Sequence, residues 1–229
     1  MSTNIIEGNP TKKFFIEMIT RDISIEDAII DLLDNSIDGA TQINPNDLSG
    51  FVINIVEIDA NKLSIKDNCG GFSLDRAQRY AFRFGRPEDA PTIKNSVGRF
   101  GIGMKRALFK MGKKFSVESQ KELEHFLVNV NVDEWCDKVK QVNTLDGKTV
   151  EIDDWTFESM TIDDRNSEDG TTIVVTDLKE DVKALFGNED FLNSLYICIT
   201  KMLCFSLIKG MKITLNNKTL TANCPELFI

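Results

Sequence analysis

The chain has 229 residues, 41% of them hydrophobic, which suits one globular domain, or one domain with a small appendage. No run of about 18 apolar residues occurs, which excludes a membrane span, and the first residues lack the layout of a secretory signal, so we expect a cytoplasmic protein. Acidic residues outnumber basic ones by 36 to 27, and the formal charge of −9 argues against direct nucleic-acid binding by this domain, because phosphate backbones attract basic surfaces.

The first half of the chain is predicted to alternate helices and strands. One helix covers residues 11–21, and a longer one begins at Ser24, where Asp27 forms an acidic variant of the capping box. Residues 51–58 and 62–67 are rich in β-branched side chains and predict two strands. A helix capped by Ser73 is expected to end near residue 84. The polar residues 85–98, with two prolines, predict a loop.

The second half is predicted to consist mainly of strands. A helix follows the glycines at 101 and 103, and strands dominate from 114 to 177, with a break at 133–139. A helix over about 189–208 and a hairpin around 216–217 complete the pattern. This order predicts an α+β domain, a two-layer α/β sandwich with the helices on one face of a mixed sheet.

The helix that begins at Ser24 has an unusual polar face. At about 100° per residue, Asp31, Asp34, Asn35 and Asp38 fall on one line, opposite the apolar side chains. Solvated helix faces usually mix Glu and Lys, whereas this line contains no cation. The carboxylates along this line repel one another. Mg²⁺ would offset this repulsion, because it takes oxygen ligands from side chains and phosphates. The stripe alone suggests such a site without deciding between it and a solvated face.

Three further segments place glycine or threonine at the ends of elements. In residues 67–71, Asp67 could accept a hydrogen bond from an exocyclic amine beside glycines that admit a planar base, although a plain turn is the simpler interpretation. Residues 98–105 lead into a helix whose first N–H groups form an anion site, with Lys105 adding a charge. The segment 170–175 is a strand opening with Thr171, and its composition is also typical of any sheet.

Together and in this order, these segments resemble the nucleotide-binding signature of the GHKL ATPases, the superfamily of gyrase B, MutL, the large heat-shock chaperone and the histidine kinases. DLLDNSIDGA (31–40) is similar to the N-box, and DNCGGF (67–72) to the Asp-Gly box. GRFGIGMK (98–105) is similar to the second glycine box of MORC-type and type II-like topoisomerase ATPases, and DGTTIVVTDL (169–178) to the fourth motif of MutL. The resemblance covers about residues 24–178 and implies the Bergerat, histidine-kinase-like ATPase fold.

The resemblance implies a role for each matching residue. Asp31 occupies the position of the general base that activates water, and Asn35 would coordinate the Mg²⁺ that bridges the triphosphate of ATP. Asp67 would bind the adenine amine, supported by Thr171. The other implied contacts are Asp38 near the adenine end of the helix, Gly71 in the Asp-Gly box, Gly98, Gly101, Ile102 and Gly103 around the phosphates, Lys105 adjacent to them, and an ATP lid at about 85–98.

Two departures from the family pattern affect what we expect. The base position is usually Glu in the ATP-hydrolysing branches, and Asp31 is one methylene shorter. Because a misplacement of about 1 Å can cost about 10²-fold in rate, hydrolysis should be slow. Cys69 stands at the first glycine of the Asp-Gly box, whereas Gly71 preserves the second.

The expected function is Mg-ATP binding with slow hydrolysis, acting as a conformational switch or a dimerisation clamp, so a nucleotide-dependent homodimer is an expected partner. The alternatives are a binding-only regulatory module, which Asp31 keeps open, and a histidine-kinase-like phosphotransferase, which normally lacks an acid at position 31. An acidic interaction domain without nucleotide would require four accidental motifs. We expect the ATP-binding domain to cover residues 1–209, and residues 210–229 resemble the start of a transducer-like domain whose C-terminal effector region is missing. The biological pathway does not follow from the fold.

Overall fold

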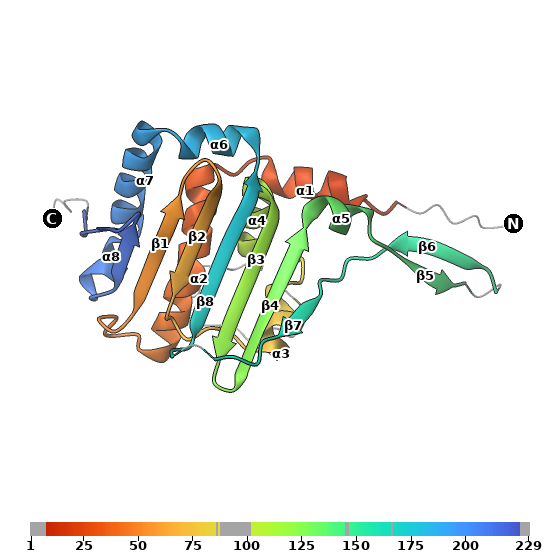
Figure 1. Ribbon diagram of the computed structural model, residues 1–229, viewed down its shortest axis with the longest axis horizontal. Helices are drawn as coiled ribbons and strands as arrows, with labels where there is room; N and C mark the ends of the chain where they lie inside the picture. The colour runs from red at the N-terminus through yellow and green to blue at the C-terminus, as the bar shows by residue number, and fades with distance from the viewer. Residues whose placement is uncertain (1–7, 86, 88–101, 145–146, 166, 225–229) are drawn as a thin grey trace, which may run out of the picture.

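The computed structural model describes residues 8–85, 87, 102–144, 147–165 and 167–224, and the statements below concern these residues (Figure 1). The strands are β1 (Val52–Ile58), β2 (Lys62–Asp67), β3 (Gly112–Lys121), β4 (Glu124–Asn131), β5 (Val139–Asn143), β6 (Thr149–Asp153), β7 (Ser159–Thr161), β8 (Gly170–Leu178), β9 (Lys212–Leu215) and β10 (Lys218–Thr219). The helices are α1 (Lys12–Thr20), α2 (Ile25–Ile43), α3 (Leu74–Arg76), the π-helical turn η1 (Ala77–Ala81), α4 (Gly103–Met111), α5 (Val132–Asp137), α6 (Glu180–Phe186), α7 (Glu189–Met202) and α8 (Cys204–Ile208).

Eight of the described strands form one mixed sheet in the order β10-β9-β1-β2-β8-β3-β4-β7. Neighbouring strands run antiparallel except β1 and β9, which are parallel. The helices α2 and α4 lie against one face of this sheet (Figure 1). This arrangement confirms the predicted α+β sandwich with helices on one face of a mixed sheet.

The core lies between α2, α4 and the sheet. On α2, the apolar side predicted from the helical period is buried, including Ile29, Leu32 and Leu33. Alternate residues of the central strands, such as Ile65 and Val117, are buried against these helices. Because α2 packs its apolar side on the core, its opposite, polar side is left to face outward, and this side carries the candidate site.

The predicted helix starts are confirmed by their caps. The hydroxyl of Thr11 accepts from the N–H of Phe14 at the start of α1, and that of Ser24 accepts from Asp27 N–H at 3.0 Å at the start of α2. Ser73 caps α3 in the same way. These bonds satisfy N–H groups that a helix start otherwise leaves unpaired.

Four details differ from the sequence predictions. The break at 133–139 is the short helix α5, and α6 was not predicted, although Val182 and Phe186 are buried at helical i,i+4 spacing. The single helix expected over 189–208 is divided at Leu203, whose φ of −104° and ψ of 19° leave the helical region and separate α7 from α8. Strands β5 and β6 form a separate two-stranded sheet that projects from the body of the domain (Figure 1).

The hairpin predicted around residues 216–217 is present between β9 and β10. Asn216 and Asn217 both have positive φ, 45° and 66°, as two-residue hairpin turns require. Strand β9 pairs with β1, so this hairpin extends the main sheet. A further, transducer-like domain stays a prediction. In the part of the chain that the structure describes, no helix is long and apolar enough to cross a membrane.

Candidate functional site

The predicted polar stripe lies along the side of α2 that faces away from the core. Asp31, Asp34 and Asp38 are partly exposed and Asn35 is exposed. The side-chain N–H of Asn35 donates to the backbone carbonyl of Asp31 at 2.7 Å. Because the nitrogen of this planar amide is bound to the helix, its oxygen Oδ1 is left as the acceptor for an external donor or cation.

Burial and neighbouring carboxylates in the stripe favour the protonated form of Asp34. Burial, together with the neighbouring charges of Asp38 and Asp31, raises the pKa of Asp34 to about 6. Within the described residues, no group of three or more His, Cys, Asp or Glu side chains is arranged to hold a metal ion. The described side chains alone therefore form no complete metal site, although the stripe has oxygen donors and negative charge that suit Mg²⁺. An ion bound there would complete its coordination with phosphate and water oxygens.

The start of α4 lies directly against this stripe. A Cβ atom placed on Gly103 would be 3.4 Å from both Cγ and Oδ2 of Asp31, so glycine allows the helix start to approach the carboxylate closely. Ile102, the N-cap residue, makes no side-chain capping bond. The first N–H groups of α4 are therefore available to an anion, and the helix dipole favours one there.

Arg106 supplies a cation that the sequence analysis missed. It lies on the first turn of α4, and its Nη2 donates to Asp31 Oδ2 at 2.6 Å. Along α2 itself the stripe has no cation, so the positive charge comes from a separate helix. A signal was available, because Arg106 follows Gly103 by three residues and so lies on the same side of its helix.

Asp67, at the end of β2, is buried among hydrogen-bond donors. Its Oδ1 accepts from the backbone N–H groups of Cys69 at 2.8 Å and Thr171 at 3.2 Å, and Oδ2 accepts from the hydroxyl of Ser36 at 2.7 Å. The antiparallel register of β2 and β8 places Thr171 directly opposite Asp67. Burial raises the pKa of Asp67 despite these bonds. A carboxylate has about four lone-pair positions, so one remains for an amine.

The contact between Asp67 and Thr171 uses the backbone N–H of the threonine, and a role of Thr171 in binding adenine stays a prediction. Ser36 was not predicted as a partner, although it occupies the next position after Asn35 on α2. Asp38 lies between Ser36 and Gly39, and a Cβ on Gly39 would be 2.6 Å from the carbonyl oxygen of Cys69. The second half of the stripe therefore adjoins the Asp67 loop, and a place for Asp38 near adenine stays a prediction.

The glycines of this loop are needed first for packing. Gly71 has a φ of 54°, and a Cβ there would be 2.1 Å from the carbonyl oxygen of Gln120. Glycine is therefore needed at this position because the backbone of β3 packs against it. Gly70 also has a positive φ, of 88°, whereas Cys69 is not among the positive-φ residues. Cys69 can therefore replace the usual glycine without backbone strain.

The side chain of Lys105, for which the sequence predicts a place beside the phosphates, is buried in the structure. Its Nζ donates to the carbonyl oxygen of Ala81 at 2.6 Å and lies 5.8 Å from the ring centre of Phe84. The side chain is almost fully buried, and this burial lowers the pKa of Lys105 to about 7. Contact of Lys105 with phosphate stays a prediction.

Several of the remaining predicted residues lie outside the part of the chain that the structure describes. Gly98 and Gly101 are outside the described residues, as is the predicted lid except for Gly85 and Pro87. A hollow of about 590 Å³ opens beside the Asp67 loop, lined in part by Asn68, Gly70 and Ile43. Asp31, Asn35 and Gly103 do not line it, so we locate the site by its polar groups and not by this hollow.

Comparison with known protein families agrees with this geometry. A family described as histidine kinase-, DNA gyrase B- and HSP90-like ATPases matches residues 23–171, which is well over half of the chain. The chain belongs to this family of GHKL ATPases. The match begins at the start of α2 and ends at Thr171, so it includes the stripe, the Asp67 loop and α4. A comparison with curated proteins gives no significant match. Membership of the GHKL family supports ATP binding by this domain.

Proposed function

We propose that this GHKL domain binds Mg-ATP and hydrolyses it slowly, with Asp31 as the general base. The observation that carries the proposal is the contact between α2 and α4, which sets the Asp31 carboxylate against the uncapped start of α4. A terminal phosphate held by the N–H groups of that helix start would lie beside both a proton acceptor and the amide oxygen of Asn35.

Each residue of the site then has one chemical task. The first turn of α4 holds the phosphate charge, and Asp67 distinguishes adenine by its remaining lone pair. Asn35 Oδ1 would hold Mg²⁺, which supplies positive charge to the phosphates when bound. Asp31 Oδ1 takes the proton of the attacking water, since Oδ2 is occupied by Arg106.

One observation favours binding without turnover as the second candidate. Asp31 is short for a general base, and Arg106 already engages one of its two oxygens. A carboxylate held away from the water by this ion pair would leave ATP bound and unreacted, so the domain would respond to ATP binding alone. Nucleotide-dependent dimerisation belongs to either version of the proposal.

Calorimetry with a non-hydrolysable ATP analogue tests the binding step. We expect heat of binding with Mg²⁺ and much weaker binding without it. The absence of heat at about millimolar analogue with Mg²⁺ present, which corresponds to a binding free energy weaker than about −4 kcal/mol, would reject the proposal.

Asp31 variants test the chemical step. Asp31→Asn keeps the size of the side chain but loses proton acceptance, so we expect phosphate release to fall to the blank while the analogue still binds. Asp31→Glu should change the rate in either direction, depending on whether the site is adapted to the shorter acid. Equal rates in wild type and both variants, in preparations free of contaminating ATPase, would remove Asp31 from the mechanism. No turnover in the wild type would leave the binding-only function.

A further inference from the structure

Arg106 joins the two helices on which the proposed site is built. It is the fourth residue of α4, and the 2.6 Å contact between its Nη2 and Asp31 Oδ2 reaches across to α2. The side chains of Arg106 and Asp31 are 33% and 26% exposed, so the pair is shielded from solvent on most sides. A charge-assisted hydrogen bond at this depth fixes side-chain geometry better than a fully exposed ion pair does.

The contact leaves Asp31 able to accept a proton. The structure gives the bond to Oδ2 alone, so the lone pairs of Oδ1 are not used by Arg106. On the side of α4, Gly103 presents no side chain to the carboxylate. The ion pair therefore holds Oδ2, the carboxylate oxygen nearest to Gly103, and leaves Oδ1 without a bond to Arg106.

Asp31 needs such a partner because its own helix opposes its charge. Asp34 and Asp38 belong to the same stripe, and the carboxylates of this group repel one another. The positive charge of Arg106 offsets that repulsion and favours the orientation of Asp31 that points toward α4. The Asp side chain has only two torsions, χ1 and χ2, so few of its conformations direct the carboxylate toward α4.

The orientation of Arg106 is not the one that stability alone would favour. Among the described residues, its Nε is buried without a hydrogen-bond partner. A guanidinium that paired through two parallel hydrogen bonds would be more stable. Nε1 of Trp135 is also such a donor among the described residues, so the unpaired Nε alone assigns no role to Arg106, whose role rests on its ion pair with Asp31.

We propose that Arg106 is a positioning residue for ATP hydrolysis: it holds Asp31 Oδ2 so that Oδ1 faces the attacking water. This inference rests on the proposed function and assigns to α4 a second task beside phosphate binding. Arg106 acts through Asp31, so its removal should lower kcat and leave nucleotide affinity almost unchanged.

The test uses four variants of the full chain: Arg106→Gln, Arg106→Lys, Asp31→Asn and the double variant Arg106→Gln/Asp31→Asn. Lys110→Gln is the matched control, because Lys110 lies one turn later on α4 and its Nζ donates to the carbonyl of Thr20 at 3.1 Å, away from Asp31. Three quantities are measured for each: phosphate release, the Kd of a non-hydrolysable Mg-ATP analogue, and the urea midpoint without nucleotide.

We expect Arg106→Gln to lower kcat by about 10-fold or more, with the analogue Kd changed by less than about 3-fold. Arg106→Lys keeps the charge and should retain part of the rate. In the Asp31→Asn background, Arg106→Gln should have no further effect on the rate, and the urea midpoints of the two single variants should not add in the double variant. Lys110→Gln should stay within about 2-fold of the wild-type kcat.

Several results would overturn the inference. An unchanged or raised kcat in Arg106→Gln would mean that the arginine restrains Asp31 or is irrelevant to it. A loss of analogue affinity as large as the loss of rate would make Arg106 a phosphate-binding residue. Additive urea midpoints would show that the pair is not coupled. Wild-type turnover no greater than that of Asp31→Asn would instead reject the proposed hydrolysis, and the role of Arg106 with it.

Discussion

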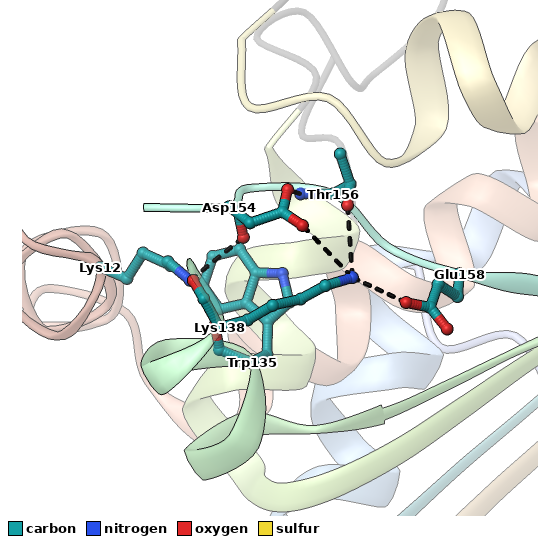
Figure 2. Close-up of polar contacts among 6 residues, drawn as sticks. All are labelled: Lys12, Trp135, Lys138, Asp154, Thr156 and Glu158. Carbon is teal, nitrogen blue, oxygen red and sulfur yellow. Dashed lines mark hydrogen bonds and ion pairs between the residues drawn. The ribbon is translucent and has the colours of Figure 1, made fainter. Parts of the chain in front are cut away.

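Two polar clusters in this domain differ in how their charged groups are neutralised. At one, Lys12 of α1 is buried, and its Nζ donates to the backbone carbonyls of Trp135 at 2.5 Å, Lys138 at 2.6 Å and Asp154 at 3.1 Å (Figure 2). An ammonium has three N–H donors, so each has a carbonyl partner. At the other, the stripe on α2 carries three carboxylates, and one of them, Asp31, pairs with Arg106.

The difference separates an architectural cluster from a functional one. The Lys12 cluster connects α1 to α5 and to the base of the β5–β6 hairpin, and Lys138 adds contacts to Thr156 and Glu158 there (Figure 2). The stripe instead crowds carboxylates, and burial together with the charges of Asp38 and Asp31 raises the pKa of Asp34. Among the described residues, each cluster has one buried donor without a hydrogen-bond partner, Nε1 of Trp135 at the first and Nε of Arg106 at the second. The crowded carboxylates of the stripe are the feature that a bound cation would stabilise.

The largest expected effect tests the architectural side of this comparison. Lys12→Met would leave three carbonyls at a buried site without their donor, so we expect the free energy of unfolding to fall by about 3 kcal/mol or more. Urea denaturation measures this loss. Nucleotide affinity of the folded fraction should not change, because Lys12 contacts no residue of the stripe in the described hydrogen bonds.

Lys13→Met is the matched control for Lys12→Met. Lys13 pairs with Asp137 at 3.4 Å, with both side chains about 70% exposed (68% and 74%). A surface pair of this kind contributes at most about 1 kcal/mol, so its loss should be small. If the two variants were equally stable, Lys12 would not anchor α1, and the contrast between the clusters would fail.

The second effect concerns Asp67, where a nearly satisfied carboxylate keeps one position for a ligand. In Asp67→Asn, the amide oxygen can still accept from the N–H groups of Cys69 and Thr171. The amide nitrogen can donate to Ser36, whose hydroxyl can also accept. We therefore expect a folded protein, destabilised by about 1 kcal/mol or less. The amide would present a donor to the adenine amine, so ATP-analogue affinity should fall by about 10- to 100-fold.

Ser36→Ala is the control for Asp67→Asn. It removes one donor to Asp67 Oδ2 but keeps the carboxylate, so stability should fall by about 1 kcal/mol while affinity falls much less than in Asp67→Asn. Calorimetry with ATP and GTP analogues gives the comparison. An unchanged ATP-analogue affinity in folded Asp67→Asn would place the base pocket elsewhere.

What the sequence could predict follows the same division. The stripe was predictable because helical periodicity alone brings Asp31, Asn35 and Asp38 to one side, and the N-cap at Ser24 sets where that period begins. The Lys12 cluster was not, because its acceptors are backbone carbonyls more than 120 residues away, and a carbonyl has no sequence signature. Ser36 and Arg106 were missed for a related reason: their contacts depend on how α2 packs against β2 and α4.

The smallest expected effect concerns Lys105, which lies between the two classes. It is buried like Lys12, and its Nζ donates to the carbonyl oxygen of Ala81 and lies near the ring of Phe84. Burial lowers the pKa of Lys105 from 10.5 to about 7. Between these values the unfolded chain binds more protons than the folded one, so the contribution of Lys105 to stability is present above pH 10.5, decreases as the pH falls and is lost through about pH 7.

Lys105→Met removes this dependence and so provides the measurement. From pH 7 to 9, the free energy of unfolding of wild type minus that of Lys105→Met should rise by about 1 kcal/mol per pH unit, near the limit for one proton. The exposed Lys113, which pairs with Asp133 at 4.0 Å, is the control, and the same difference for Lys113→Met should be flat. A flat difference for Lys105→Met would mean that the ammonium stays charged in the folded protein. Its carbonyl and aromatic contacts would then offset burial completely, and Lys105 would belong with Lys12 among the architectural cations.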